Sequence, residues 1–560
     1  MNRAQRRAEA RSGRGRAVAA LGSAAVLASA GGGAVLVLAS SAPAGATGDV
    51  FVVSNLLDSG AGSLRDAIDS ANLDGSDQDQ ITFSVSGTIT LASDLPTITG
   101  PVHVNGPGAG NLAVDGAGSH SAFRFDHIAA ADGTREVTGL TVTHALTLGY
   151  LGPAISAEHV GADLAIADVV LTANTAGRGG AGINLYHESG RVDITRSVIS
   201  HNSASFGGGI YVFAEEGEDL VVSIADTSIT DNTAHSGGGV YAVDATVVVT
   251  DSVISGNTAE TGKGGGILVN IDAGSPSLTV VDSTLCGNSA AHGGGLFFEG
   301  SDLTVLGSTV SANTAGLYGG GLYITASGDV TIANATITGN TANQASGVAT
   351  YAAGTTAILQ STITGNAATG ADPSRINYPL TAGVQIASGV APLEVGGRRA
   401  RYAAAPSDAS ARRGGHGGDV RTAGDIGPSG PVTVTGTILA GNTGGYDVGL
   451  YNTGAVALTE TGSIVGTVDP AVTVTDGGRN QNGLTAAALL LGPLADNGGP
   501  TFTHALLAGS PAIDAGPSTV PTFDGNGHDQ RGVGYARVVA GTVDVGAFEV
   551  QPAPEPSFTG

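Results

Sequence analysis

Apolar side chains recur through the middle of the chain at fixed distances from a repeated asparagine. In all nine copies an aliphatic residue stands three and eight residues before the Asn, and the first eight copies also carry Ala two residues after it. Within each copy the apolar positions alternate with period two, which predicts short strands and not helices. The repeated asparagines are Asn174, Asn202, Asn232, Asn257, Asn288, Asn313, Asn340, Asn366 and Asn442.

A glycine cluster and a further alternating stretch follow several of these asparagines, as in Gly207-Gly208-Gly209-Ile210-Tyr211-Val212. Three short strands per copy cannot bury a core alone, but copies stacked coil on coil can. We therefore expect an all-β fold, a right-handed parallel β-helix. We expect each Asn to take a left-handed backbone conformation at a bend, and the stacked Asn side chains to hydrogen-bond along the axis.

The ends of the chain differ from the repeats. Arginines crowd the first sixteen residues, an Ala/Val/Leu/Gly run follows, and Ala44-Gly45-Ala46 fits the cleavage rule of a secretory signal. The alternative is an uncleaved membrane anchor. Leu64, Ala67, Ile68 and Ala71 form an apolar stripe after Ser63, which predicts a capping helix. We also expect a β-rich C-terminal cap, because a solenoid must cover its ends.

These features divide the chain into six parts. We expect a signal peptide at 1–46, an N-terminal cap at 47–80, coils at 81–369, a low-complexity flexible insertion at 370–430, final coils at 431–484, and a C-terminal capping domain with its tail at 485–560.

Composition and charge exclude several classes of protein. The chain has 23 basic against 48 acidic residues, a formal net charge of −25, so it lacks the basic footprint that nucleic-acid binding needs. An acidic surface also repels anionic lipid headgroups, so we expect membrane contact only through an uncleaved signal segment. A single Cys excludes a disulfide scaffold and Cys-based metal sites.

Three segments together resemble a known group of proteins. The Asn and Gly-Gly-Gly repeats resemble the right-handed β-helix repeats of bacterial surface proteins and are similar to those of polymorphic outer-membrane adhesins. Residues 58–68, with Ser63-Leu64-Arg65-Asp66-Ala67, resemble the capping region found before such helices. Asn497-Gly498-Gly499-Pro500, residues 509–516, Asp529-Gln530-Arg531-Gly532 and residues 544–549 resemble a "choice-of-anchor" C-terminal domain. The resemblance implies a secreted or surface-displayed β-helix.

One file of acids is a candidate for catalysis. Six residues before the repeated Asn, three consecutive copies carry Asp226, Asp251 and Asp282, which stacking would place about 4.8 Å apart. Parallel β-helices include pectate lyases and polygalacturonases, whose chemistry needs converging carboxylates or a base with calcium. The alternative is a solvated turn position in an acidic protein.

A file of aromatic residues is a candidate for ligand binding. Tyr211, Tyr241, Phe297 and Tyr323 each follow an inward-facing residue of the third strand, so we expect them to point outward on one face. Such a file could stack on sugar rings, or its rings could stack on one another and stabilise the sheet.

Near the C-terminus, Asp524, Asn526 and Asp529 offer oxygen ligands at loop spacing, so Ca²⁺ is a possible ligand, although a hydrogen-bonded turn is the alternative. We otherwise expect no cofactor. The function that we expect is a secreted or cell-surface, adhesin-like scaffold that binds a polysaccharide or cell-surface ligand without catalysis. The alternative is a polysaccharide-active enzyme, pectate lyase-like or glycoside hydrolase-like, that uses the acid file.

Overall fold

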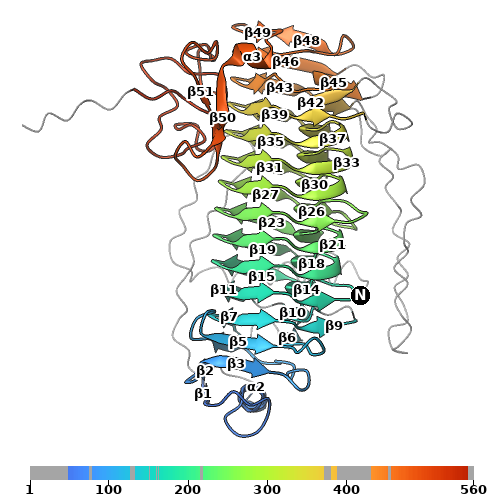
Figure 1. Cartoon of the computed structure of the whole chain (residues 1–560), viewed down its shortest axis with the longest axis vertical. Coiled ribbons are helices and arrows are strands. Elements are labelled where there is room, and N and C mark those ends of the chain that lie inside the picture. The colour runs from blue at the N-terminus through green and yellow to red at the C-terminus, as the bar shows by residue number, and fades with distance from the viewer. Residues whose placement is uncertain are drawn as a thin grey trace, which may run out of the picture. The chain divides into compact units, whose positions relative to one another are not determined.

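Parallel strands stacked coil on coil form the body of the protein (Figure 1). The computed structural model describes residues 48–74, 78–126, 133–149, 152–158, 161, 163–214, 219–370, 380–387, 430–451 and 456–552. The predicted signal peptide at 1–46 lies outside these residues. Four parallel sheets run along the stack, which we call sheets A, B, D and C in the order that the chain visits them in each coil.

Sheets A and B carry the first two strands of each coil. Sheet A contains β1 (Val50–Val53), β2 (Asp79–Phe83), β4 (Val102–Asn105), β7 (Arg135–Thr138), β11 (Leu164–Ala167), β15 (Gly190–Thr195), β19 (Leu220–Ala225), β23 (Thr246–Thr250), β27 (Leu278–Val281), β31 (Leu303–Leu306), β35 (Val330–Ala333), β39 (Thr356–Leu359), β43 (Val432–Thr435), β46 (Ala457–Thr461) and β48 (Thr473–Asp476). Sheet B contains β3 (Gly87–Thr90), β5 (Leu112–Asp115), β8 (Thr141–Thr143), β12 (Val170–Thr172), β16 (Val198–Ser200), β20 (Ser228–Thr230), β24 (Val253–Ser255), β28 (Thr284–Cys286), β32 (Thr309–Ser311), β36 (Thr336–Thr338), β40 (Thr362–Thr364), β44 (Ile438–Leu439), β47 (Ile464–Val465) and β49 (Gln481–Asn482).

Sheets D and C complete the coil. Sheet D contains β9 (Leu146–Thr147), β13 (Thr175–Ala176), β17 (Ser203–Phe206), β21 (Thr233–Ser236), β25 (Thr258–Ala259), β29 (Ser289–His292), β33 (Thr314–Tyr318), β37 (Thr341–Gln344) and β41 (Ala367–Ala368). Sheet C contains β6 (Phe123–Asp126), β10 (Ile155–Glu158), β14 (Ile183–Glu188), β18 (Ile210–Ala214), β22 (Val240–Val243), β26 (Ile267–Asn270), β30 (Leu296–Gly300), β34 (Leu322–Ala326), β38 (Val348–Ala352), β42 (Thr381–Ala387) and β45 (Tyr446–Tyr451). The sequence predicts three strands per coil, whereas the structure adds the short strands of sheet D directly after the repeated Asn.

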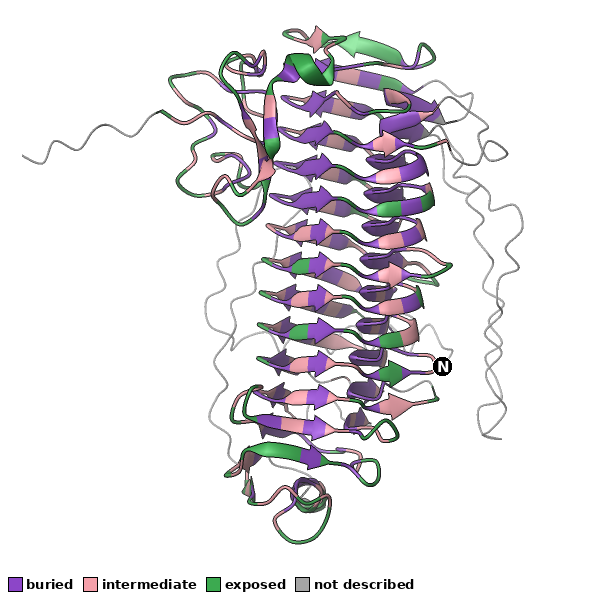
Figure 2. Ribbon diagram, viewed as in Figure 1, coloured by how far each residue is buried: buried purple, intermediate pink, exposed green. Residues whose placement is uncertain are grey.

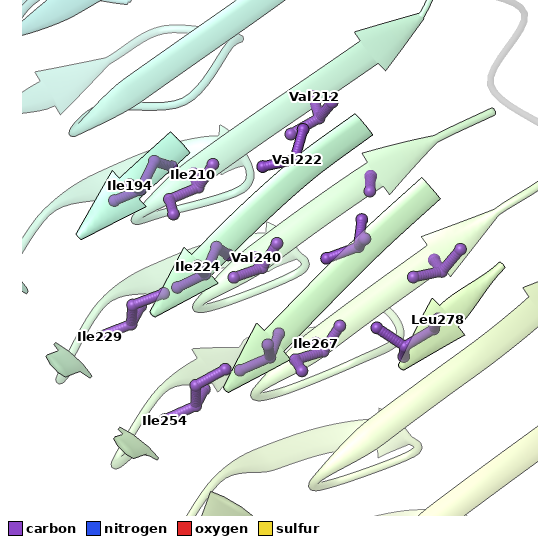
Figure 3. Packing of buried hydrophobic residues seen from close by; sticks show 14 of the residues in the cluster. Ile194, Ile210, Val212, Val222, Ile224, Ile229, Val240, Ile254, Ile267 and Leu278 are labelled. Carbon is purple, nitrogen blue, oxygen red and sulfur yellow. The ribbon is translucent and has the colours of Figure 1, made fainter. Parts of the chain in front are cut away.

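Aliphatic side chains of successive coils fill the interior in register. In one coil Val222 and Ile224 from β19, Ile229 from β20 and Val240 from β22 point inward, and the next coil repeats the arrangement (Figure 3). The outward positions between them are more exposed in the coils of the N-terminal half (Figure 2). The period-two pattern of the sequence therefore places the core correctly.

The nine repeated asparagines form a single buried file along the stack. The side-chain amide of each Asn donates to the side-chain oxygen of the Asn one coil further on, over 2.8 to 3.0 Å, and its backbone N–H donates to the same oxygen. The last member, Asn442, donates in the same way to Oδ1 of Asp447. The file therefore links the sheet B to sheet D corner of every coil from 174 to 442.

The left-handed residue at this corner is not the Asn itself, as the sequence suggested, but the residue directly before it. Positive φ values occur at Ala173, His201, Asp231, Gly256, Gly287, Ala312, Gly339, Gly365 and Gly441. The preceding residue makes the bend, which leaves the Asn side chain pointing into the coil where its amide finds buried partners.

At the N-terminal end of the coils lies the helix α2 (Leu64–Asp74) (Figure 1). Its backbone begins as predicted, because Oγ of Ser63 accepts a hydrogen bond from the N–H of Asp66. Leu64, Ala67 and Ile68 join the core beside β1 and β2. The helix is short and covers only this first part of the stack.

The C-terminal segment, residues 485–552, differs from the predicted β-rich cap. Its regular elements within the described residues are α3 (Ala486–Leu489) and one antiparallel pair, β50 (Leu491–Ala495) with β51 (Thr503–Leu506). It packs against the side of the later coils, on the outer face of sheet B (Figure 1). There it covers a flank of the stack.

The predicted insertion at 370–430 contains a coil strand. β42 lies between β38 and β45 in sheet C, so residues 381–387 belong to the stack and not to a loop. The rest of the predicted insertion, 371–379 and 388–429, lies outside the described residues.

Candidate functional site

Two files of outward side chains run side by side along the corner between sheets D and C. The D file contains Phe206, Ser236, Lys263, His292, Tyr318 and Gln344, and the C file contains Tyr211, Tyr241, Leu268, Phe297, Tyr323 and Ala349. In every coil the two members are five residues apart, separated by the small residues of the corner and one inward aliphatic residue.

The glycines of this corner bring the two files together. A Cβ on Gly238 would lie 2.6 Å from the carbonyl oxygen of Gly265 and 2.7 Å from backbone atoms of Thr258. Only a residue without a side chain allows neighbouring coils to approach so closely. The glycine cluster is therefore the local reason that the two files are in contact.

Towards the C-terminal end of the corner, His292, Phe297, Tyr323 and Tyr351 pack against one another in an arrangement that we call the closed stack. Phe297 and Tyr323 stack face to face with ring centroids 4.7 Å apart, and Tyr351 follows at 5.4 Å from Tyr323. From the D file, His292 meets Tyr323 edge-on at 5.8 Å. Phe297 and Tyr323 are only 3% and 5% exposed. The prediction that these two rings face a ligand is therefore wrong: they are buried in mutual packing.

Towards the N-terminal end the same corner is more open. Five aromatic residues there, which we call the aromatic platform, are all half-buried: Tyr186, Phe206, Tyr211, Phe213 and Tyr241. The rings of Tyr211 and Tyr241 lie 5.5 Å apart, and Phe206 approaches Tyr241 at 5.8 Å. The rings of Tyr186 and Phe213 stack at 5.5 Å. The structure thus places Tyr211 and Tyr241 of the predicted file in this accessible group.

Lys263 lies between the two ends of the corner. Its ammonium sits 4.5 Å from the centroid of the Phe297 ring, an attractive cation–π contact. Its side chain is half-buried. Sequence reasoning missed this residue, although its place five residues before Leu268 identifies it as a member of the D file.

The acid file lies at the corner between sheets A and B. Asp226, Asp251 and Asp282 all have positive φ values of 47° to 50°, so they occupy the tight turn that ends each sheet A strand. The same position in the two preceding coils holds Asp168 and Arg196, which form an exposed two-point ion pair at 2.7 and 3.0 Å. Asp tolerates this left-handed conformation, which accounts for an acid at a turn without a catalytic role.

Electrostatics nevertheless distinguish the members of this file. Burial, reinforced by the charge of Asp251, raises the pKa of Asp282 to about 6. Partial burial, with the charge of Asp226, also raises the pKa of Asp251. Asp282 sits beside Gly307, whose carbonyl oxygen accepts a hydrogen bond from Thr501 of the C-terminal segment. The file therefore contains two carboxyl groups, those of Asp251 and Asp282, whose pKa burial raises.

The predicted calcium loop is not assembled. Both oxygens of Asp529 accept hydrogen bonds from the Arg531 guanidinium, and its side chain is buried. Asn526 donates to the carbonyl of Pro521, while Asp524 is exposed. Within the part of the chain that the structure describes, no group of three or more His, Cys, Asp or Glu residues is placed to hold a metal ion.

The residues around this loop instead attach the C-terminal segment to the coils. The amide of Gln530 donates to the hydroxyls of Thr309 and Thr501 at 3.0 and 2.9 Å, and its oxygen accepts from Thr336. Fully buried Arg537 donates to Asn334 of the coil corner. Gln530, one of the motif residues that resemble the "choice-of-anchor" domain, thus binds the C-terminal segment to the coils. The resemblance to that domain stays a prediction.

A buried carboxyl group belongs to the same attachment. Glu549 lies 4.0 Å from Arg537 and accepts a hydrogen bond from the N–H of Asp544. Burial raises the pKa of Glu549 to about 8, and it lowers the pKa of Arg537 to about 10. These shifts have a structural origin in the packing of the segment and mark no open site.

Comparison with known proteins supports the fold. Residues 133–310 and 221–395 match the family model described as the right handed beta helix region. The A-modules of the Azotobacter vinelandii mannuronan C-5 epimerases AlgE6 and AlgE4 are similar at 16% identity and a TM-score of 0.43, over 75% of this chain and 93% and 92% of theirs. At that distance neither activity nor substrate transfers to this chain. No curated protein matches it. Neither described helix is long and apolar enough to cross a membrane. The matched residues and the stacked parallel sheets identify the fold as a right-handed parallel β-helix.

Proposed function

We propose that the protein is an exported, non-catalytic scaffold that binds a glycan or cell-surface ligand in the manner of an adhesin. The observation that supports this is the aromatic platform, in which half-buried rings occupy neighbouring coils about 4.8 Å apart. Aromatic faces held in place by a rigid sheet offer large apolar contact areas at little entropic cost. A pyranose ring is close to the coil spacing in size, so an extended sugar chain along the axis could meet one coil per residue.

Binding by Tyr211 and Tyr241 tests this proposal directly. We expect the double variant Tyr211→Ser/Tyr241→Ser to lose adhesion to glycan-coated surfaces, because both rings leave the platform. The matched control is Phe502→Ser, which removes an exposed ring of the C-terminal segment. Unchanged adhesion of the Tyr211→Ser/Tyr241→Ser protein, with both variants folded by circular dichroism, would remove the platform as the site.

Export forms part of the same proposal. It rests on the arginine-rich start, the apolar run and the small-residue sequence Ala44-Gly45-Ala46. Expression of the full chain in a secreting host should release a protein whose first residue is Thr47. A product that stays in the membrane fraction with an intact N-terminus would favour the uncleaved anchor instead.

A polysaccharide-active enzyme is the second candidate, and the raised pKa values of Asp251 and Asp282 favour it. A carboxyl group with a pKa of about 6, as in Asp282, is one that general acid–base chemistry uses. If the protein cleaves glycans, Asp282→Asn should abolish the release of reducing ends or unsaturated products. Asp168→Asn, at the same turn of an earlier coil, is the control that should leave the activity unchanged.

A further inference from the structure

The chain contains a single lysine, Lys263, and it lies at the boundary between the aromatic platform and the closed stack. Tyr241 is in the preceding coil, paired in register with Leu268, five residues after Lys263. The backbone of Lys263 is therefore about one coil spacing beyond the last ring of the platform, and its ammonium contacts Phe297 of the following coil. A ligand that lies along the axis of the stack and covers the platform rings would therefore reach Lys263 next.

No carboxylate of the described residues neutralises this ammonium. Among them no Asp or Glu oxygen forms an ion pair with Lys263, and Glu260, an acid of the same coil, is exposed. The Phe297 ring holds the side chain in place on one side. A half-buried cation that is fixed by an aromatic ring and lacks a counterion is suited to receive an anion from a ligand.

A second cation, Arg178, lies at the other end of the platform. Its carbonyl oxygen accepts a hydrogen bond from the N–H of Phe206, so it belongs to the coil before the first ring of the D file. In a chain with a net charge of −25, both ends of the platform thus carry positive residues. Of the two, Lys263 carries the preference for an anionic over a neutral ligand at the platform.

The acid file does not cancel this local preference. The acid file lies at the corner between sheets A and B, whereas the platform lies at the corner between sheets D and C. Sheet B separates the acid file from the platform on one side of the coil and sheet A on the other. At physiological ionic strength exposed charges beyond about 8 Å are largely screened. The contact with Lys263 is short-range and half-buried, so it is screened less.

We propose that the aromatic platform binds a uronic-acid-containing glycan, with the sugar rings on Tyr211 and Tyr241 and a sugar carboxylate on the ammonium of Lys263. The inference rests on the proposed function and names the class of ligand. Lys263 is the specificity-determining residue in this arrangement. The aromatic contacts supply binding to any sugar, and the ammonium supplies the preference for a carboxylate.

The test compares one polyuronate oligosaccharide with its carboxyl-reduced form, which differs only at the carboxylate. We measure both affinities by calorimetry for the wild-type protein, for Lys263→Met and for Lys263→Arg. Met keeps an unbranched side chain packed on Phe297 and removes only the charge. A sulfated oligosaccharide of the same length is the third ligand.

We expect the wild-type protein to prefer the carboxylated chain roughly tenfold, as one charge-assisted contact provides. Lys263→Met should bind the two chains equally, and Lys263→Arg should keep the preference. Equal affinities of the wild-type protein for the two chains, or a preference that survives Lys263→Met, would overturn the inference. The platform would then remain the proposed binding site. A sulfated chain bound more tightly than the uronate would overturn the carboxylate assignment. Absence of binding to every chain would contradict the proposed function itself.

Discussion

The coils of the N-terminal and C-terminal halves share one interior and differ in what covers them. In both halves the inward positions are aliphatic and the same asparagine file runs through them. In the N-terminal half the platform rings, such as Tyr211, remain half-buried. In the C-terminal half the rings of the C file, Phe297 and Tyr323, stack on each other and are buried. There the C-terminal segment also covers sheet B at Thr309 and Thr336.

This difference shows that the inward and the outward positions of the strands have separate roles. The inward residues make a coil stack on its neighbours, whatever lies outside. The outward residues decide whether that coil packs against the protein itself or faces solvent. Here the outward packing changes between Tyr241 and Phe297, and the proposed binding surface lies on the more exposed side of that boundary.

Removing a ring from the closed stack should have the largest effect. Phe297→Ala takes away a buried ring together with its contacts to Tyr323 and Lys263, and we expect a loss of about 3–5 kcal/mol in the free energy of unfolding. Tyr211→Ala, from the same file in the open half, should cost much less. Urea unfolding of both variants checks this, and equal losses would show that the two halves do not differ.

Loosening the C-terminal segment should come next. Gln530→Ala removes an amide that bridges Thr309, Thr336 and Thr501, and it leaves their buried hydroxyls with fewer partners. We expect a loss of about 3 kcal/mol. Limited proteolysis should then release the segment earlier than in the wild-type protein, while the coils resist. Release at the wild-type rate would mean that other contacts hold the segment.

A change at the glycine corner should have an intermediate effect. In Gly238→Ala the new methyl group would clash with the backbone of Gly265 and Thr258, so we expect a loss of about 1–3 kcal/mol. Gly316→Ala is the matched control, because its nearest neighbour would be 3.8 Å away and its φ is not positive. Equal unfolding midpoints for the two variants would contradict the role that we give to this corner.

The pH dependence of the C-terminal segment should be the smallest effect. The pKa of Glu549 in the folded protein, about 8, lies above the ordinary value of 4.5, so the folded state binds the extra proton. Stability therefore falls as the pH rises from about 4.5 to 8. Asp282, with a pKa of about 6, has the same sign at lower pH, whereas burial lowers the pKa of His103 and His504 below the ordinary 6.5 and gives the opposite sign near that pH. The slope between about pH 7 and 8 therefore reports on Glu549 best. Melting curves of Glu549→Gln should lose this slope; a slope that persists would assign it to another group.

The sequence predicts the stack well because its signal is repeated. The nine asparagines and the aliphatic residues before them recur in copy after copy, so errors in one copy are corrected by the others. The helix after Ser63 also follows from local rules. Sheet D escaped prediction because β25 and β13 are only two residues long, too short for an alternating pattern.

The sites were predicted less well, because exposure depends on neighbours that are far apart in the sequence. Nothing at Tyr211 or Phe297 itself shows that one is half-buried and the other buried. Residues of neighbouring coils make the difference: Tyr323 and Lys263 pack on Phe297, whereas Tyr241 meets Tyr211 edge-on. Asp529 likewise offers calcium ligands in sequence, while in space Arg531 occupies both its oxygens. The five-residue offset between the files was visible in the sequence and could have identified Lys263.

The asparagine file has a direction. Each of the first eight side-chain amides donates towards the C-terminal end to the oxygen of the next Asn, and each of the nine also donates to a backbone carbonyl of the preceding coil. Aligned amide dipoles add up, as they do along a helix, so the positive pole of the file lies at Asn442. Oδ1 of Asp447 accepts hydrogen bonds from both the backbone N–H and the side-chain amide of Asn442. The side-chain oxygens of the file thus point towards its N-terminal end over all the coils from Asn174 to Asn442, and the carboxylate of Asp447 ends the file.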